Sequence, residues 1–205
     1  LVGSEMCIRD RNYSLFYIET PLFLRVTLLL LAEIIITGGL MYDGFMDTAD
    51  GVFSARSRER MLEIMKDSHV GSNAVLAIII LLLLKIAAYL ELSGETLTWV
   101  LLTMSVATRT FMVVFIVNFP YARKEGIGHM FTKYAKPFYT YIAFAVCAGI
   151  IAACGLQYLA VAGICFTVTL IIAQYLKTQL GGLTGDTYGA PVSYTHLTLP
   201  TNREV

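Results

Sequence analysis

Residues 73–90 read "NAVLAIIILLLLKIAAYL", a run of apolar side chains interrupted by one charged residue, Lys85. An α-helix needs about 20 mostly apolar residues to cross the hydrocarbon core of a bilayer. Four other stretches of the chain are apolar over similar lengths. They lie at roughly 21–40, 96–119, 137–153 and 156–176. The sequence therefore predicts an all-α fold, a polytopic integral membrane helix bundle with about five spans.

The composition agrees with this class of protein. Of the 205 residues, 57% are hydrophobic and only 15% are charged, whereas soluble domains carry about 25% charged residues. Basic and acidic residues number 15 each, so the net charge is zero and indicates no particular partner. We expect the lipid bilayer as a partner and no nucleic acid, and the sequence leaves a homo-oligomer open.

The two ends of the chain do not resemble the apolar text between them. Residues 1–11 and 191–205 resemble translated sequencing-adapter read-through, and we expect them to be non-native. We therefore expect a single membrane-embedded domain over 12–190 that is incomplete at both ends.

The basic residues predict an orientation in the membrane. Lys and Arg crowd the connections 41–72 and 121–136, while the connection 91–95 holds two glutamates and no base. The positive-inside rule places the first two in the cytoplasm and the third outside. Counting spans onward returns 177–190 to the cytoplasmic face of the cell membrane, the inner membrane of a bacterium or archaeon. Four charged residues fall within or near the spans, where charge indicates function by default. They are Arg25, Glu33, Lys85 and Arg109. Arg25 and Lys85 are expected to extend to the membrane surface.

The stretch "GGLMYDGFMDTADG", residues 38–51, places Asp43, Asp47 and Asp50 directly after the first apolar segment. On a helix the three side chains lie within about 60° of one another. Carboxylates this close repel and partly neutralise unless a cation holds them ionised. An oxygen-only cluster suits Mg²⁺, Mn²⁺ or Ca²⁺ better than zinc. Ordinary surface acids on an interfacial helix are the simpler alternative.

The next stretch, "SRERMLEIMKDSHVG" at 57–71, is amphipathic. It places Glu63 and Asp67 one turn apart, able to face the aspartates across an amphipathic cytoplasmic helical hairpin. Asp67 stands apart from the dense cluster, so we predict that it is the general base and that Glu63 is its neighbour or a second metal ligand. Asp67 could equally complete the metal sphere, and the sequence leaves this open.

These two stretches, with "PYARKEG" (120–126) and "GGLTGDTYGA" (181–190), resemble the signature motifs of the cobalamin synthase family, adenosylcobinamide-GDP ribazoletransferase. The four motifs occur in order over about 30–190. Met41 stands where the family usually has His, and His69 stands where Arg is common.

The resemblance implies a Mg²⁺-dependent phosphotransferase of cobalamin biosynthesis. It would join adenosylcobinamide-GDP to α-ribazole, or to its 5′-phosphate, and release GMP. Asp43, Asp47 and Asp50 would hold Mg²⁺ against the pyrophosphate. The substrate-binding residues implied are Arg56, Arg123, Lys124 and Asp186.

A weaker likeness and a rival function accompany this interpretation. "DTADGVFSAR" (47–56) is similar to the D-x-x-D-G-x-x-A-R motif of the CDP-alcohol phosphotransferases, with one extra residue before Ala55. Those membrane enzymes also use metal-bound aspartates, and we take the likeness as a mechanistic analogy. A cation-coupled transporter could use buried acids equally well, but it predicts a second aspartate cluster in an inverted repeat, and the sequence has none.

Overall fold

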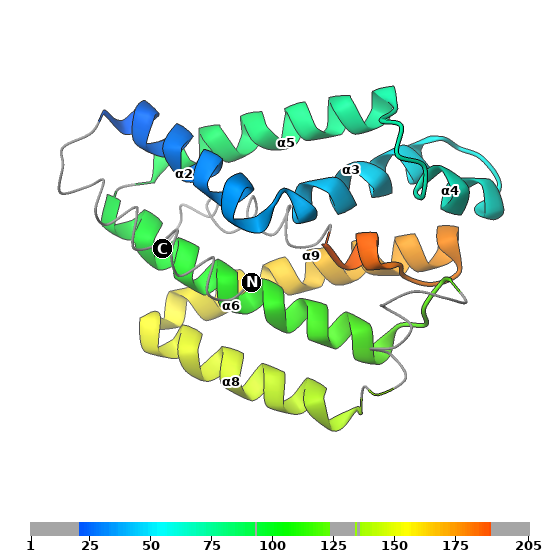
Figure 1. Ribbon diagram of the computed structural model, residues 1–205. Coiled ribbons are helices and arrows are strands. Elements are labelled where there is room, and N and C mark those ends of the chain that lie inside the picture. The colour runs from blue at the N-terminus through cyan, green and yellow to red at the C-terminus, as the bar shows by residue number, and fades with distance from the viewer. Residues whose placement is uncertain (1–20, 93, 124–133, 135, 190–205) are drawn as a thin grey trace.

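The structure is a computed structural model that describes residues 21–92, 94–123, 134 and 136–189. Helices make up nearly all of this part, and α5, α6, α8 and α9 lie lengthwise in one bundle (Figure 1). The helices are α2 (Leu22–Thr37), α3 (Leu40–Phe53), α4 (Arg58–Ile64), α5 (Ser72–Glu91), α6 (Gly94–Asn118), α8 (Phe138–Cys154) and α9 (Leu156–Leu180). A further short helix covers 185–189.

The predicted all-α membrane bundle is confirmed, and each of the five apolar segments forms a helix. Three of the described helices, α5, α6 and α9, are long and apolar enough to cross a membrane. The helices α2 and α3 pass the same test only as a pair, bent by 87°. α8 is apolar but has 17 residues, a length of about 25 Å at 1.5 Å per residue. The expected five spans thus correspond to three full helices, one bent pair and one shorter helix.

The bend between α2 and α3 lies at Gly38 and Gly39. Both adopt left-handed backbone conformations, with φ of 61° and 71°. Residues that have a Cβ atom rarely adopt such conformations. The Gly39 N–H donates to the carbonyl of Ile34 at 2.9 Å, which closes the end of α2. The sequence pattern extended the first apolar segment to residue 40 because composition alone does not reveal this break.

Two apolar clusters hold the bundle together. The larger joins α6, α8 and α9 around Phe111, Phe115 and Cys165, all at most 2% exposed. The smaller joins α2, the end of α5 and the start of α6 around Leu29 and Tyr89. Many outward-facing side chains of α5 and α9 are large and apolar, which is the surface a lipid environment favours.

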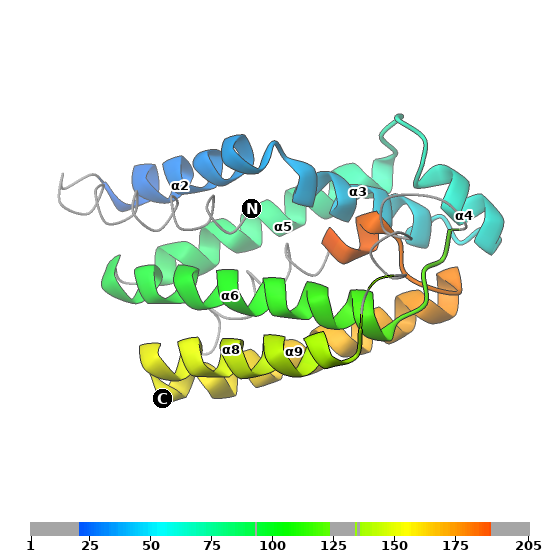
Figure 2. The ribbon, with the colours of Figure 1, turned by 60° about the horizontal axis from the view of Figure 1, so that its bottom comes forward.

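One end of the bundle gathers the segments that carry the polar motifs. In both ribbon views α3, α4, the C-terminal end of α9 and the short helix 185–189 lie together there (Figures 1 and 2). Met61 on α4 and Met65, which directly follows α4, form a small cluster with Leu180 of α9. α3 packs against α4 as the predicted hairpin requires, and it packs more extensively along α5.

Candidate active site

Asp43 and Asp47 lie one helical turn apart on α3. Asp43 is exposed and Asp47 is half-buried. The carboxylates of Asp43, Asp186 and Asp50 repel that of Asp47, while the guanidinium of Arg123 attracts it. Three acidic groups and one basic group thus act on Asp47, and this excess of negative charge favours a bound cation.

Asp186 reaches this place because the segment 181–189 folds back against α3. A Cβ on Gly44 would lie 2.8 Å from the backbone oxygen of Asp186, so only glycine permits the close approach of the two segments. The motifs at 38–51 and 181–190 are far apart in the sequence but in direct contact in the fold.

The third motif joins the same site through a short backbone pairing. Tyr121 and Leu183 form an isolated parallel bridge. The Ala122 N–H donates to the Leu183 carbonyl at 2.8 Å, and the Leu183 N–H donates to the Pro120 carbonyl at 2.9 Å. This pairing places Arg123 beside Asp186, with 3.0 Å between Nη2 and Oδ2. The Arg123 side chain is 16% exposed, and its Nε has no hydrogen-bond partner among the described residues.

Asp50 has different surroundings from the other two aspartates of α3. It is buried, and its two carboxylate oxygens accept the backbone N–H groups of Gly71 at 2.5 Å and of Ala74 at 3.0 Å. Gly71 is the N-cap residue of α5 and Ala74 lies in its first turn, where backbone N–H groups have no partner within the helix. Asp50 thus caps α5 from a neighbouring helix, and its predicted role as a metal ligand stays a prediction.

Glu63 and Asp67 are not paired with the aspartates of α3. The buried residues here are Met61 on α4 and Met65 directly after it, the latter against Gly51. Glu63 is exposed and pairs with Arg60 at 2.8 Å. Asp67 is exposed, and its Oδ1 accepts hydrogen bonds from the backbone and ring nitrogens of His69. Neither acid is among the described charges that act on Asp47. The segment that carries Glu63 and Asp67 nevertheless ends at Gly71, whose N–H donates a hydrogen bond to Asp50.

The hydrogen bonds from His69 set the charge state of this exposed pair. The side-chain bond from His69, followed by its backbone bond, lowers the pKa of Asp67 below its ordinary value. The same side-chain bond raises the pKa of His69. Asp67 is therefore ionised at neutral pH, as a general base must be, while the lowered pKa also weakens its affinity for a proton.

Of the remaining predicted substrate-binding residues, Arg56 is described by the structure. Arg56 is exposed in the linker between α3 and α4, next to Ala55, whose φ is 51°. Lys124 lies outside the described residues. Among the described residues, no group of three or more His, Cys, Asp or Glu side chains converges closely enough to hold a metal ion unaided.

Two features of the site were missed by sequence reasoning. The guanidinium of Arg58 lies against Gly181 at the C-terminal end of α9, where a cation interacts favourably with the helix dipole. The rings of Tyr121 and Tyr188 stack with centroids 6.4 Å apart beside the pair of Arg123 and Asp186. Tyr188 is 4% exposed. No spacing in the sequence indicates either contact, because both join segments that are distant along the chain.

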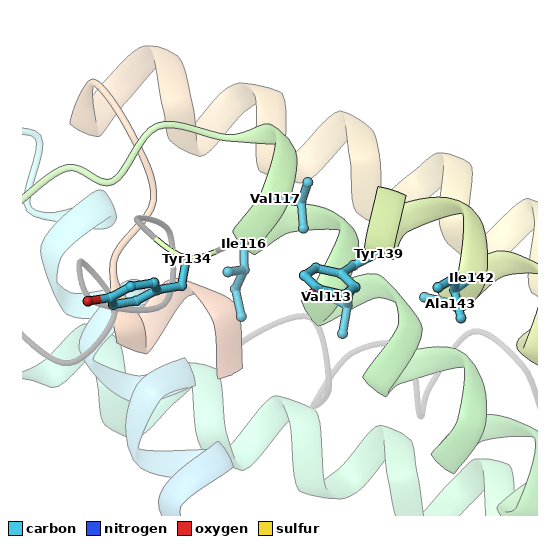
Figure 3. Close-up of a pocket in the computed structure, with 7 residues that line it drawn as sticks. All are labelled: Val113, Ile116, Val117, Tyr134, Tyr139, Ile142 and Ala143. Atoms are coloured by element: carbon cyan, nitrogen blue, oxygen red, sulfur yellow. The ribbon is translucent and has the colours of Figure 1, made fainter. Parts of the chain in front are cut away.

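An apolar groove has none of these polar groups in its lining. It measures about 580 Å³ and is lined by α6, Tyr134 and α8, with Val113, Tyr139 and Ile142 among its residues (Figure 3). None of the predicted site residues lines it, so the polar end of the bundle remains the candidate site.

Comparison with known proteins agrees with the motifs. Residues 12–200 match the family described as cobalamin-5-phosphate synthase. The chain belongs to the cobalamin-5-phosphate synthase family. The predicted family resemblance is thereby confirmed, and the transporter alternative finds no support. No solved structure matches the chain.

Curated members of the cobalamin-5-phosphate synthase family resemble the chain over most of its length. Each of the following is named adenosylcobinamide-GDP ribazoletransferase. The protein of Desulforamulus reducens is 43% identical over 78% of this chain and 65% of its own length. Those of Desulfitobacterium hafniense and Clostridium novyi are 37% and 38% identical, over 86% and 93% of this chain and 72% and 77% of their own lengths. The chain thus spans just under two thirds of the first relative. All three relatives are thus named as transferases, the class of enzyme that the sequence predicts for this chain.

The contact between Gly44 and Asp186 makes the first prediction. Gly44→Val is expected to push the segment 181–189 away from α3, because its Cβ would meet the Asp186 carbonyl at 2.8 Å. Moving a site residue by about 1 Å can cost about 100-fold in rate. The rate of the reaction catalysed at this site should therefore fall about 100-fold. Gly149→Val on α8, where a Cβ meets nothing within 4 Å, is the control and should retain activity. A fully active Gly44→Val protein would show that this contact does not build the site.

Proposed function

We propose that this protein is an adenosylcobinamide-GDP ribazoletransferase. It would join adenosylcobinamide-GDP to α-ribazole, or to α-ribazole 5′-phosphate, and release GMP. In this reaction the acceptor hydroxyl forms a new O–P bond, the bridging P–O bond of the pyrophosphate breaks, and GMP leaves. One observation carries the proposal. Three family motifs that are far apart in the sequence bring Asp43, Asp47, Arg123 and Asp186 together at one end of the bundle.

The donor set fits Mg²⁺ held jointly by protein and substrate. Asp43, Asp47 and Asp186 supply only oxygen ligands, which hard cations prefer. The absence of a three-carboxylate cage among the described residues agrees with how Mg²⁺ binds in enzymes of this kind, through one or two carboxylates plus substrate phosphates. Asp43 and Asp47 would hold the ion. When bound, Mg²⁺ would offset the negative charge of the pyrophosphate.

The basic residues would bind the pyrophosphate, and the second acidic segment would accept a proton. Arg123 has a buried Nε that is unpaired among the described residues, and its guanidinium suits two-point binding of a phosphate. On substrate binding Arg123 would exchange Asp186 for the pyrophosphate, with Lys124 and Arg56 as further cationic contacts. Asp67 would accept the proton of the attacking hydroxyl, with Glu63 beside it. This step requires the loop between α4 and α5 to bring Asp67 to the substrate.

The active site would face the cytoplasm of a multi-pass protein in the cell membrane. The bias of Lys and Arg toward 41–72 and 121–136 supports this orientation. In a background without native cysteines, Ser57→Cys should be shielded from a membrane-impermeant thiol reagent in intact cells. Leu156 is 74% exposed and lies at the end of α9 that is remote from the candidate site. Leu156→Cys should therefore be labelled. Labelling at 57 without labelling at 156 would contradict the orientation.

The proposed activity is tested by following GMP in membranes that contain the protein. GMP should appear only when adenosylcobinamide-GDP and α-ribazole, or its 5′-phosphate, are both present, together with an equal amount of the joined corrinoid product. The ratio of kcat/KM for the two acceptors identifies which form is used. No GMP with either acceptor, or GMP released equally well without acceptor, would refute the proposed transfer.

A further inference from the structure

A buried ion pair joins three helices within the apolar part of the bundle. The Nζ of Lys85 on α5 lies 2.7 Å from the Oε1 of Glu33 on α2 and 2.9 Å from the hydroxyl of Tyr42 on α3. Lys85 is 0% exposed and the Glu33 side chain is 9% exposed. The expectation that Lys85 extends to the membrane surface is therefore wrong, because an acid on a neighbouring helix pairs with it instead.

Stability alone gives little reason for this arrangement. Taking two charges out of water is costly, and apolar residues of similar size are often as stabilising as a buried ion pair. A buried pair can instead specify one geometry among several that apolar packing would permit. The pair is therefore expected to determine the geometry of one feature of the fold.

That feature is the bend between α2 and α3. Glu33 precedes the Gly38–Gly39 break and Tyr42 follows it. Lys85 contacts the side chains of Glu33 and Tyr42. A Cβ on either glycine would meet nothing within 4 Å, so the space beside both glycines is open. The angle of α3 then depends on contacts on either side of the break. Tyr42 is adjacent to Asp43 and lies on the same helix as Asp47.

We propose that Lys85 is a positioning residue that sets the α2–α3 bend through Glu33 and Tyr42, and so places Asp43 and Asp47 for metal and pyrophosphate binding. The link to metal and pyrophosphate rests on the proposed function. The control of the bend does not, so the two parts can fail separately.

The main test separates positioning from stability. In the double variant Glu33→Met/Lys85→Met an apolar pair replaces the charges, and thermal stability should be unchanged or raised. Spin labels at Ile35 on α2 and Phe53 on α3, both 67% exposed, report the bend in a background without native cysteines. The distance distribution should broaden in the double variant. Its half-saturating Mg²⁺ concentration for GMP release should rise about tenfold.

Tyr42→Phe removes one hydroxyl and leaves the ion pair intact. Losing a hydrogen bond to a charged group changes an equilibrium constant by at least about tenfold. Because only part of this loss reaches the metal site, the half-saturating Mg²⁺ concentration should rise by no more than about tenfold. Tyr158→Phe on α9, away from this cluster, is the matched control and should behave as wild type. A wild-type distance distribution in the double variant, or an unchanged Mg²⁺ requirement in both variants, would overturn the proposal. If the wild-type protein releases no GMP, the proposed function fails, and the label distances still decide whether Lys85 sets the bend.

Discussion

Replacing Asp67 by asparagine is expected to lower kcat by about 10²–10⁴-fold and to leave the Mg²⁺ requirement nearly unchanged. The change removes a proton acceptor but keeps the size of the side chain. The asparagine oxygen can still accept the backbone N–H of His69, which now lies 3.1 Å from the Asp67 carboxylate, so the loop between α4 and α5 should keep its shape. The measurement is the rate of GMP release as a function of Mg²⁺ concentration.

The control for this variant is Glu59→Gln, which removes another exposed carboxylate from the first turn of α4. It should change the rate by no more than about twofold, as surface substitutions usually do. If Asp67→Asn regains its rate when Mg²⁺ is raised, Asp67 is a metal ligand. If its rate is normal throughout, Asp67 serves only to hold His69, and another carboxylate is the base.

Asp47→Asn is expected to reduce turnover at least about 100-fold at low Mg²⁺, with partial recovery at high Mg²⁺. Asp47 has the carboxylates of Asp43, Asp186 and Asp50 around it, so removing its charge weakens cation binding. The same change relieves repulsion, and the thermal stability of the metal-free protein should therefore be maintained or raised. Mg²⁺-dependent rates and thermal unfolding of one preparation provide both measurements.

The matched comparison is Asp50→Asn. Both oxygens of Asp50 accept backbone N–H groups at the start of α5, and asparagine can replace only one of these acceptors. The expected result is a loss of about 1–3 kcal/mol in stability with a smaller effect on the Mg²⁺ dependence than Asp47→Asn has. Equal effects of the two variants on Mg²⁺ dependence would restore Asp50 as a ligand.

The helical fold could be predicted from sequence because membrane helices depend on local composition. Each apolar run satisfies its own backbone hydrogen bonds, so its position can be seen without knowledge of its neighbours. The Gly38–Gly39 break was not predicted, because "TGG" after an apolar run is compatible with a helix end, a kink or a turn. The 87° bend depends on how α2 and α3 pack against α5.

The sequence predicted which residues belong to the candidate site, but not which partners each of them contacts. Motif resemblance identified Asp47, Arg123 and Asp186, and the structure brings them together. A shared helix face gave the three aspartates of α3 one predicted role, yet Asp50 accepts hydrogen bonds from the backbone at the start of α5. Periodicity describes the face of a helix on which a residue lies, while the partner on that face is determined by tertiary packing.

We propose that this site binds a divalent cation together with a pyrophosphate. Electron paramagnetic resonance can measure Mn²⁺ binding to the membrane-embedded protein, with and without adenosylcobinamide-GDP and in the absence of the acceptor. We predict weak Mn²⁺ binding by the protein alone, binding at least about tenfold tighter with adenosylcobinamide-GDP present, and loss of that gain in Asp47→Asn. Mn²⁺ binding that is indifferent to adenosylcobinamide-GDP, or unaffected by Asp47→Asn, would contradict the claim.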